Sequence, residues 1–130
     1  MWDLYNEPGN SRREMVTEPH LRKFFEIARE IDPIQPLTAC TFRCSPDVNT
    51  PIPEIEQIAC DLSDIISYHN YGSYQNNIRI IKRLKDTYGR PIVNTEWLGR
   101  VLHNTVQEMF PLFYLEKIGC YNWEIGRAHV

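Results

Sequence analysis

Two glutamates follow apolar, strand-like segments and could act together as a pair of catalytic carboxyl groups. Glu7 ends the run at residues 2–7 and is followed directly by Pro8, and Glu96 ends the run at residues 90–96. A carboxyl group at the end of a buried strand costs free energy unless water, a partner or a substrate receives it. Cleavage of a glycosidic bond uses two such groups, one protonated and one ionised. Glu7 and Glu96 are therefore the candidate catalytic residues.

Other polar and aromatic side chains gather where the apolar runs stop. Flat aromatic rings offer faces on which sugar rings stack, although a single aromatic residue is more often part of a core. No Gly-rich turn follows any of these runs in a phosphate-binding pattern, which counts against a nucleotide site. The candidate substrate-binding residues are Asn6, His69, Tyr71, Trp97 and Trp123.

Glu7, His69 and Glu96 have side chains that can also bind metal ions. The sequence contains neither the HxH nor the HExxH spacing that is typical of zinc sites. We therefore expect no metal.

Amphipathic segments separate the apolar runs and predict four helices. Residues 16–33 have Thr17 as a candidate N-cap, and residues 73–89 have Ser73 as a cap and Gly89 as a terminator. Residues 52–59 predict a shorter helix. Asn104 and Gln107 resemble a capping box for a helix over residues 105–119.

Strand ends fall near residues 7, 41, 69, 96 and 123, with one helix between each pair. This alternation is typical of βαβ units on a parallel sheet, so the fold class is α/β. Periodicity does not separate an open doubly wound sheet from an arc of an eight-stranded barrel. The polar residues at the strand ends favour the barrel, because active sites of (β/α) barrels lie at that rim.

Four short motifs occur together at these strand ends, namely NEP at residues 6–8, HNY at 69–71, TEW at 95–97 and YNW at 121–123. In their order and spacing the sequence resembles clan A of the glycoside hydrolases, most closely the cellulase-like family 5 group. The resemblance covers residues 1–123. It implies a partial TIM barrel that spans about strands four to eight, with no cofactor.

The resemblance also implies a role for each candidate residue in a retaining β-glycosidase. Glu7 would be the acid/base and Glu96 the nucleophile, while Tyr71 would hold Glu96 through its hydroxyl group. Asn6 would bind the sugar 2-hydroxyl, and His69 would help to bind the sugar. The floor beneath the sugar ring would be Trp123. The substrate would be a β-linked plant-type glycan such as cellulose, mannan, xylan or mixed-linkage glucan, and related enzymes of carbohydrate catabolism are generally exported.

Composition limits the other classes of function. The 130 residues carry a net charge of −3 with mixed signs, so no basic block predicts a nucleic-acid partner. The apolar runs are too short to span a bilayer. The four cysteines lack zinc-finger or CxxC spacing and predict no disulfide framework.

Both ends of the sequence suggest a fragment. Residues 124–130 abandon the preceding pattern, and their simplest back-translation resembles a sequencing-library adapter, so we interpret them as a non-native tail. An arc of five parallel strands would leave two open edges. Two alternatives therefore remain: a catalytically incompetent fragment that at most binds sugar weakly, and a doubly wound α/β binding domain with its ligand at a strand-order reversal.

Overall fold

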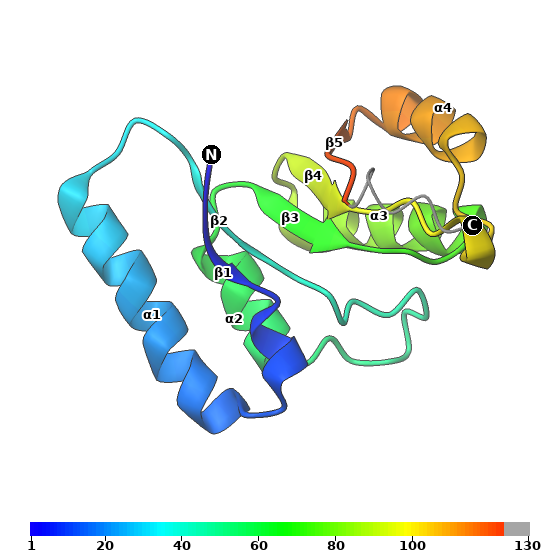
Figure 1. Ribbon diagram of the computed structural model, residues 1–130. Coiled ribbons are helices and arrows are strands. Elements are labelled where there is room, and N and C mark those ends of the chain that lie inside the picture. The colour runs from blue at the N-terminus through cyan, green and yellow to red at the C-terminus, as the bar shows by residue number, and fades with distance from the viewer. Residues whose placement is uncertain (124–130) are drawn as a thin grey trace.

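The computed structural model describes residues 1–123 and folds them as alternating strands and helices (Figure 1). This confirms the predicted α/β alternation. The interpretation of residues 124–130 as a non-native tail lies outside the described residues. The strands are β1 (Trp2–Asn6), β2 (Leu37–Cys40), β3 (Ile66–His69), β4 (Ile92–Glu96) and β5 (Gly119–Cys120). The helices are α1 (Glu14–Ile31), α2 (Glu54–Leu62), α3 (Tyr74–Tyr88) and α4 (Val106–Glu116), with short 3-10 turns η1 (Pro8–Ser11) after β1 and η2 (Arg100–Leu102) after β4.

All five strands run parallel and lie side by side in their order along the chain. β1 pairs with β2, and β4 lies between β3 and β5. The two groups join at Thr41, whose N–H donates to Ser67 O at 3.0 Å and whose carbonyl accepts the His69 N–H at 2.8 Å. Within residues 1–123 the strand order never reverses. A doubly wound sheet requires such a reversal, so the order counts against that alternative.

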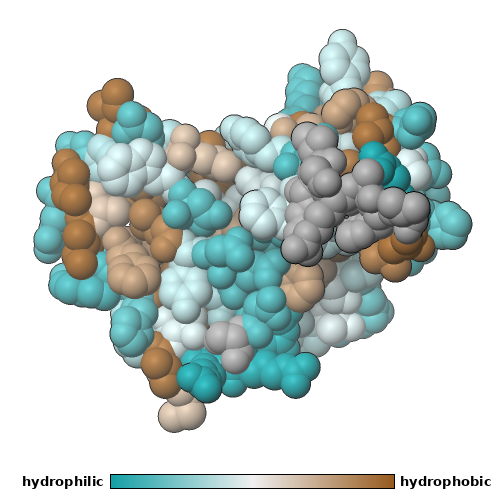
Figure 2. All heavy atoms as spheres, in the orientation of Figure 1, coloured by the Kyte–Doolittle hydropathy of each residue, from teal (hydrophilic) through white to brown (hydrophobic). Residues whose placement is uncertain are grey.

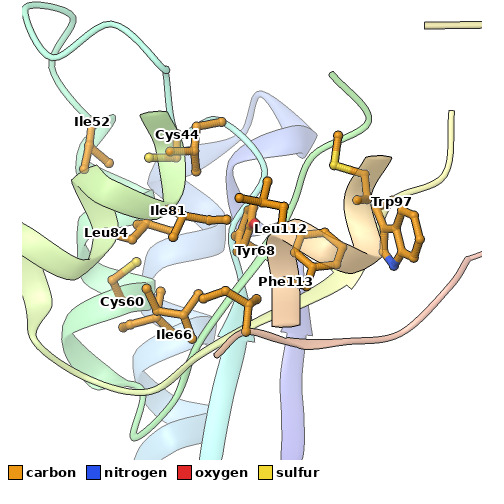
Figure 3. Close-up of a cluster of buried hydrophobic side chains, with 14 residues drawn as sticks. Cys44, Ile52, Cys60, Ile66, Tyr68, Ile81, Leu84, Trp97, Leu112 and Phe113 are labelled. Carbon is orange, nitrogen blue, oxygen red and sulfur yellow. The ribbon is translucent and has the colours of Figure 1, made fainter. Parts of the chain in front are cut away.

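The helices cover one face of this sheet. Leu37 and Ala39 of β2 pack against α1 and α2, whereas Ile66 and Tyr68 of β3 pack against α3 and α4. Figure 3 shows Tyr68 close to Leu112 of α4, within the buried cluster that β3 forms with α3 and α4. In Figure 1, α1 flanks the β1 end of the sheet and α4 flanks the β5 end. Right-handed crossovers between neighbouring parallel strands place helices on a common face in this way.

The opposite face carries short polar side chains, because successive residues of a strand point to opposite sides. Thr38 Oγ1 lies 2.6 Å from Ser67 Oγ on the adjacent strand. Cys40 Sγ lies 2.7 Å from Thr95 Oγ1, although β3 separates their strands. Strands two places apart in a flat sheet are about 9.5 Å apart, which two such short side chains do not span. The sheet therefore curves toward this polar face.

Helix α3 confirms both of its predicted ends. Ser73 Oγ accepts the N–H of Asn76 at 3.4 Å, and Gly89 ends the helix in a left-handed conformation with φ 60°. In α1, by contrast, the prediction that Thr17 is the N-cap is wrong. The N–H groups of Val16 and Thr17 both donate to Arg13 O at 2.9 Å, so the helix begins earlier and Thr17 is buried within it.

The capping box predicted from Asn104 and Gln107 is also wrong. Thr105 occupies the N-cap of α4 and makes no side-chain cap hydrogen bond. The Asn104 side chain is buried and binds the backbone of two loops instead. A buried amide with three backbone partners in these loops is satisfied where it lies.

Among residues 1–123, the helices are too short or too polar to cross a membrane. The four cysteines are free thiols, and Cys40, Cys44 and Cys60 are buried. Burial raises the pKa of Cys44 to about 11 and that of Cys60 to about 12. These thiols are therefore protonated at neutral pH and behave as small apolar side chains.

Candidate active site

Glu7 lies in a tight turn at the carboxyl end of β1. Its backbone is left-handed, with φ 50° and ψ 63°. This conformation is uncommon for a residue with a side chain and concentrates at functional sites. The Glu7 N–H donates to Cys40 O at 3.1 Å, and Asn10 Nδ2 donates to Glu7 Oε2 at 2.6 Å. The turn and these two contacts fix the direction of the Glu7 side chain.

Glu96 is the last residue of β4 and keeps an extended backbone within the sheet. Its carbonyl accepts the N–H of Asn70 at 3.0 Å. The hydroxyl of Tyr71 donates to Glu96 Oε2 at 2.7 Å, so the contact implied for Tyr71 is present. A hydroxyl that donates to a carboxylate stabilises its negative charge.

His69 lies between the two carboxyl groups and contacts both. Its Nδ1 is 2.6 Å from Glu7 Oε1, and its Nε2 is 3.5 Å from Glu96 Oε1. The His69 side chain is only 1% exposed, against 12% for Glu7 and 15% for Glu96. An imidazole held at both nitrogens and packed on all sides sets the spacing between the two glutamates.

The two carboxyl groups converge although they come from the ends of β1 and β4. One oxygen of Glu7 and one of Glu96 lie within 4.8 Å of each other. Retaining glycosidases hold their two carboxyl groups about 5–5.5 Å apart, whereas inverting enzymes need about 6.5–9.5 Å to admit a water molecule. The separation in this site is on the retaining side of that division.

Glu7, His69 and Glu96 also offer the atoms that a metal ion would bind. His69, however, directs Nδ1 to Glu7 and Nε2 to Glu96, from opposite sides of its ring. A single ion cannot bind both nitrogens, so its entry would break one of these contacts. We assign no metal to this group.

A third carboxyl group, that of Asp3 on β1, interacts electrostatically with His69 and Glu96. Burial raises the pKa of Asp3, and backbone N–H groups oppose that rise. Burial also raises the pKa of the neighbouring Cys40 to about 12, so its thiol carries no charge at neutral pH. Asp3 is therefore a third carboxyl group that interacts electrostatically with the site.

Asn104 joins the loops that follow β3 and β4, a role that its local sequence does not indicate. Its Nδ2 donates to Asn70 O at 3.2 Å and to Gly72 O at 2.7 Å. Its Oδ1 accepts the N–H of Leu98 at 3.1 Å, and Leu98 has the positive φ of 79°. These bonds hold together the two loops next to Tyr71 and Glu96.

Glu56 of α2 is a second residue that the sequence analysis missed. Its side chain is fully buried, with Oε2 accepting the Phe42 N–H at 3.1 Å and Oε1 accepting the Arg43 N–H at 3.3 Å. The signal that could have identified it is its position midway between Ile52 and Cys60, on the apolar face of the helix. An acidic residue on such a face is unusual enough to mark a specific role.

The remaining candidates lie in different surroundings. Asn6 is exposed beside Glu7, and Trp123, the last described residue, is 53% exposed. Trp97 is fully buried against Phe110 and Phe113 of α4, with ring centroids 5.3 and 5.2 Å from its own. Its ring has no free face for a sugar, so the structure places Trp97 in the core (Figure 3) and gives no support to direct substrate contact.

The fold and the site define a parallel α/β chain with a paired-carboxyl site at the carboxyl ends of its strands. Comparison with known protein families, curated proteins and solved structures found no match. The functional assignment therefore depends on the geometry of the site and on the motifs that built it.

Proposed function

We propose that this chain forms part of a retaining β-glycosidase that hydrolyses O-glycosyl bonds of a plant-type β-glycan. The observation that carries the proposal is the approach of the Glu7 and Glu96 carboxyl oxygens within 4.8 Å, with His69 between them. That separation is close to the spacing of retaining enzymes. The resemblance of the four motifs to family 5 of the glycoside hydrolases supports the same assignment.

Each carboxyl group has a distinct role in the proposed reaction. The Glu96 carboxylate attacks the anomeric carbon and forms a covalent glycosyl-enzyme, while Glu7 gives its proton to the departing glycosidic oxygen. Glu7 then takes a proton from water, which attacks the same carbon and releases Glu96. Two displacements retain the anomeric configuration, and substrate, water and the two glutamates supply every atom.

The surrounding side chains fit supporting roles. Tyr71 stabilises the charge of Glu96 before attack by donating its hydroxyl hydrogen bond. His69 is too deeply buried to offer an open sugar-binding surface, so we assign it to holding the two glutamates. Asn6 and Trp123 are exposed and remain the candidates for contact with the sugar.

We further propose that the five strands form an arc of a (β/α)8 barrel. Three features support the arc: sequential strand order, helices on a single face and curvature toward the polar face. The position of the two glutamates at the carboxyl ends of the strands is that of barrel active sites.

The second candidate is a polypeptide that is catalytically incompetent with only these strands. Exposed apolar side chains on the β1 flank favour it: Trp2, Phe24, Ile27 and Ile31 are each 41–65% exposed and line a groove between β1 and α1. Figure 2 shows apolar residues along the flank formed by α1. An apolar groove beside an unpaired strand edge promotes aggregation.

The test uses protein expressed from the complete open reading frame that encodes residues 1–123. We expect hydrolysis of at least one of cellulose, mannan, xylan or mixed-linkage glucan, with the β-anomer formed first in ¹H NMR. Glu7→Gln and Glu96→Gln should both impair this activity, whereas Glu54→Gln, at an exposed position of α2, should not. An α-anomer as first product, or full activity in either site variant, would contradict the proposal. A wild-type protein inactive on the whole panel would favour the second candidate.

A further inference from the structure

We propose that Glu56 is a positioning residue for Glu7. Its buried carboxylate holds the turn after β1, in which Glu7 lies, against the loop after β2. The inference rests on the proposed function, which makes Glu7 the acid/base.

Glu56 has an unusual environment for an acidic residue. Among residues 1–123 it is the one Asp, Glu, Lys or Arg side chain that is buried. Both of its oxygens accept backbone N–H groups, from Phe42 and Arg43, which is the pattern of the ionised form. An apolar side chain of similar volume would avoid the cost of burying a charge, so the acid is better explained by what it contacts.

Glu56 Oε1 faces the turn that contains Glu7. A Cβ atom at Gly9 would overlap Glu56 Oε1, so glycine permits the close approach of the turn to this carboxylate. Arg43 Nη1 completes the contact by donating to Gly9 O at 3.1 Å and to Glu14 Oε1 at 2.9 Å. Carboxylate, glycine and guanidinium thus hold the turn in which Glu7 adopts its left-handed backbone.

Charged and titratable groups face Glu56 from several elements: Glu7 after β1, Arg43 after β2, and the thiols of Cys44 and Cys60. Burial raises the pKa of Glu56, two backbone N–H groups and then Arg43 lower it, and the charge of Glu7 raises it. The contacts of Glu56 with the loop after β2 and with the turn at Gly9 therefore position Glu7.

The test uses the protein from the complete open reading frame and its Glu56→Gln variant, which keeps the shape but replaces one acceptor oxygen with an amide NH₂. Glu54→Gln, which removes an exposed charge two residues earlier on α2, is the matched control. Without substrate, we expect the ¹³C chemical shifts of Glu7 and Gly9 to change in Glu56→Gln and to stay unchanged in the control. Where hydrolysis is measurable, a displaced acid/base impairs the chemical step, so we expect kcat to fall by about 10-fold or more in Glu56→Gln, with KM changed by less than about 2-fold.

A folded Glu56→Gln variant with unchanged ¹³C shifts of Glu7 and Gly9 would overturn the proposal. Should that variant not fold, Gly9→Ala decides, because its added Cβ would overlap Glu56 Oε1. Unchanged ¹³C shifts of Glu7 in Gly9→Ala would then overturn it. Changed shifts in Glu56→Gln, together with a wild-type protein that hydrolyses no β-glycan, would support the positioning role and remove the proposed function.

Discussion

The two candidate catalytic glutamates are held by parts of the chain that are built differently. Glu7 lies in a left-handed turn supported by polar contacts, from Asn10 beside it and Glu56 beneath it. Glu96 ends a regular strand, and the next residue, Trp97, is fixed in the apolar core by two phenylalanines of α4. The surroundings of Glu7 are stabilised mainly by charge and hydrogen bonds, and those of Glu96 mainly by packing.

The two clusters of buried side chains show the same contrast. The cluster around β3, β4, α3 and α4 contains 14 residues, whereas the cluster around β2, α1 and α2 contains eight. This difference suits the proposed chemistry. A nucleophile has to stay in one position relative to the carbon that it attacks, and dense packing provides that. An acid/base has to lose and regain a proton, so the charges around it matter as much as its position.

The largest effects should come from replacing the two glutamates. The two variants should differ in how their activity depends on the leaving group of the substrate. Glu96→Gln should lower kcat/KM by at least about 10⁴-fold on every substrate, because each needs the nucleophile. Glu7→Gln should cost about 10²–10⁴-fold on natural glycans and far less on a dinitrophenyl glycoside, whose leaving group needs no proton. Steady-state kinetics on both substrate types measures this, with Glu54→Gln as the control. If the activity of both variants depended on the leaving group in the same way, Glu7 and Glu96 would not have separate roles as acid/base and nucleophile.

The second largest effect should come from removing the packing of Trp97, the residue that follows Glu96. Trp97→Ala should lower the free energy of unfolding by about 3–5 kcal/mol, because it empties a site that is fully buried. Trp123→Ala is the matched control at an exposed tryptophan and should change that free energy by less than about 0.5 kcal/mol. Urea denaturation followed by circular dichroism measures both. Similar losses in the two variants would show that Trp97 does not anchor the nucleophile strand.

Much of this arrangement could be predicted from the sequence. Apolar runs that stop at Glu7, His69 and Glu96 identified the strand ends, and parallel strands present those ends at one edge of a sheet. Convergence of the two glutamates followed from that geometry. The helix ends at Ser73 and Gly89 were predictable because each residue type favours one local conformation.

The remainder depends on contacts between distant segments. Asn104 fits a helix cap by its local sequence, but its Nδ2 donates to two loop residues more than 30 positions earlier in the chain. Phe24 and Ile31 continue the apolar stripe of α1 yet stay exposed, because periodicity defines the stripe and not the part that a neighbour covers. A tryptophan after a strand suits a sugar platform as well as a core. Only the position of α4 decides that the Trp97 ring is buried.

Removing one hydrogen bond from each glutamate should have smaller, unequal effects. Tyr71→Phe loses the hydroxyl that donates to Glu96 Oε2, and a bond to a charged group of about 1.5–3 kcal/mol corresponds to about a 10- to 100-fold loss in kcat/KM. Asn10→Ala loses the amide that donates to Glu7 Oε2. That contact is exposed, so water can replace it, and we expect a loss of about 2- to 5-fold. Kinetics of the two variants checks the order, and a greater loss in Asn10→Ala would reverse the comparison.

The smallest predicted effect concerns a charged pair away from the site. It tests whether charge also stabilises the part of the chain around Glu7 at that distance from the site. Arg29 of α1 donates to both oxygens of Asp64, at 2.7 and 2.8 Å, and Asp64 also accepts the N–H of Leu37 at 2.8 Å. The bond from Arg29 is the main reason that the pKa of Asp64 is lowered. A carboxyl group with a lowered folded-state pKa stabilises the fold above its unfolded value of 3.8, and this stability is lost as the pH falls through the folded pKa.

Asp64→Asn should therefore lower the free energy of unfolding at pH 7, and the loss should be smaller at pH 3, below the unfolded pKa of 3.8. The pair is 48% and 39% exposed, so solvent limits the loss to about 1 kcal/mol or less. Asp86→Asn, which breaks a more exposed pair with Lys82 on α3, is the control and should cost no more than about 0.3 kcal/mol. Urea denaturation at both pH values measures the difference. If Asp64→Asn lowered the free energy of unfolding equally at both pH values, the contact between α1 and β2 would depend on shape and not on charge. The contrast between the two parts of the chain would then hold only at the turn that carries Glu7.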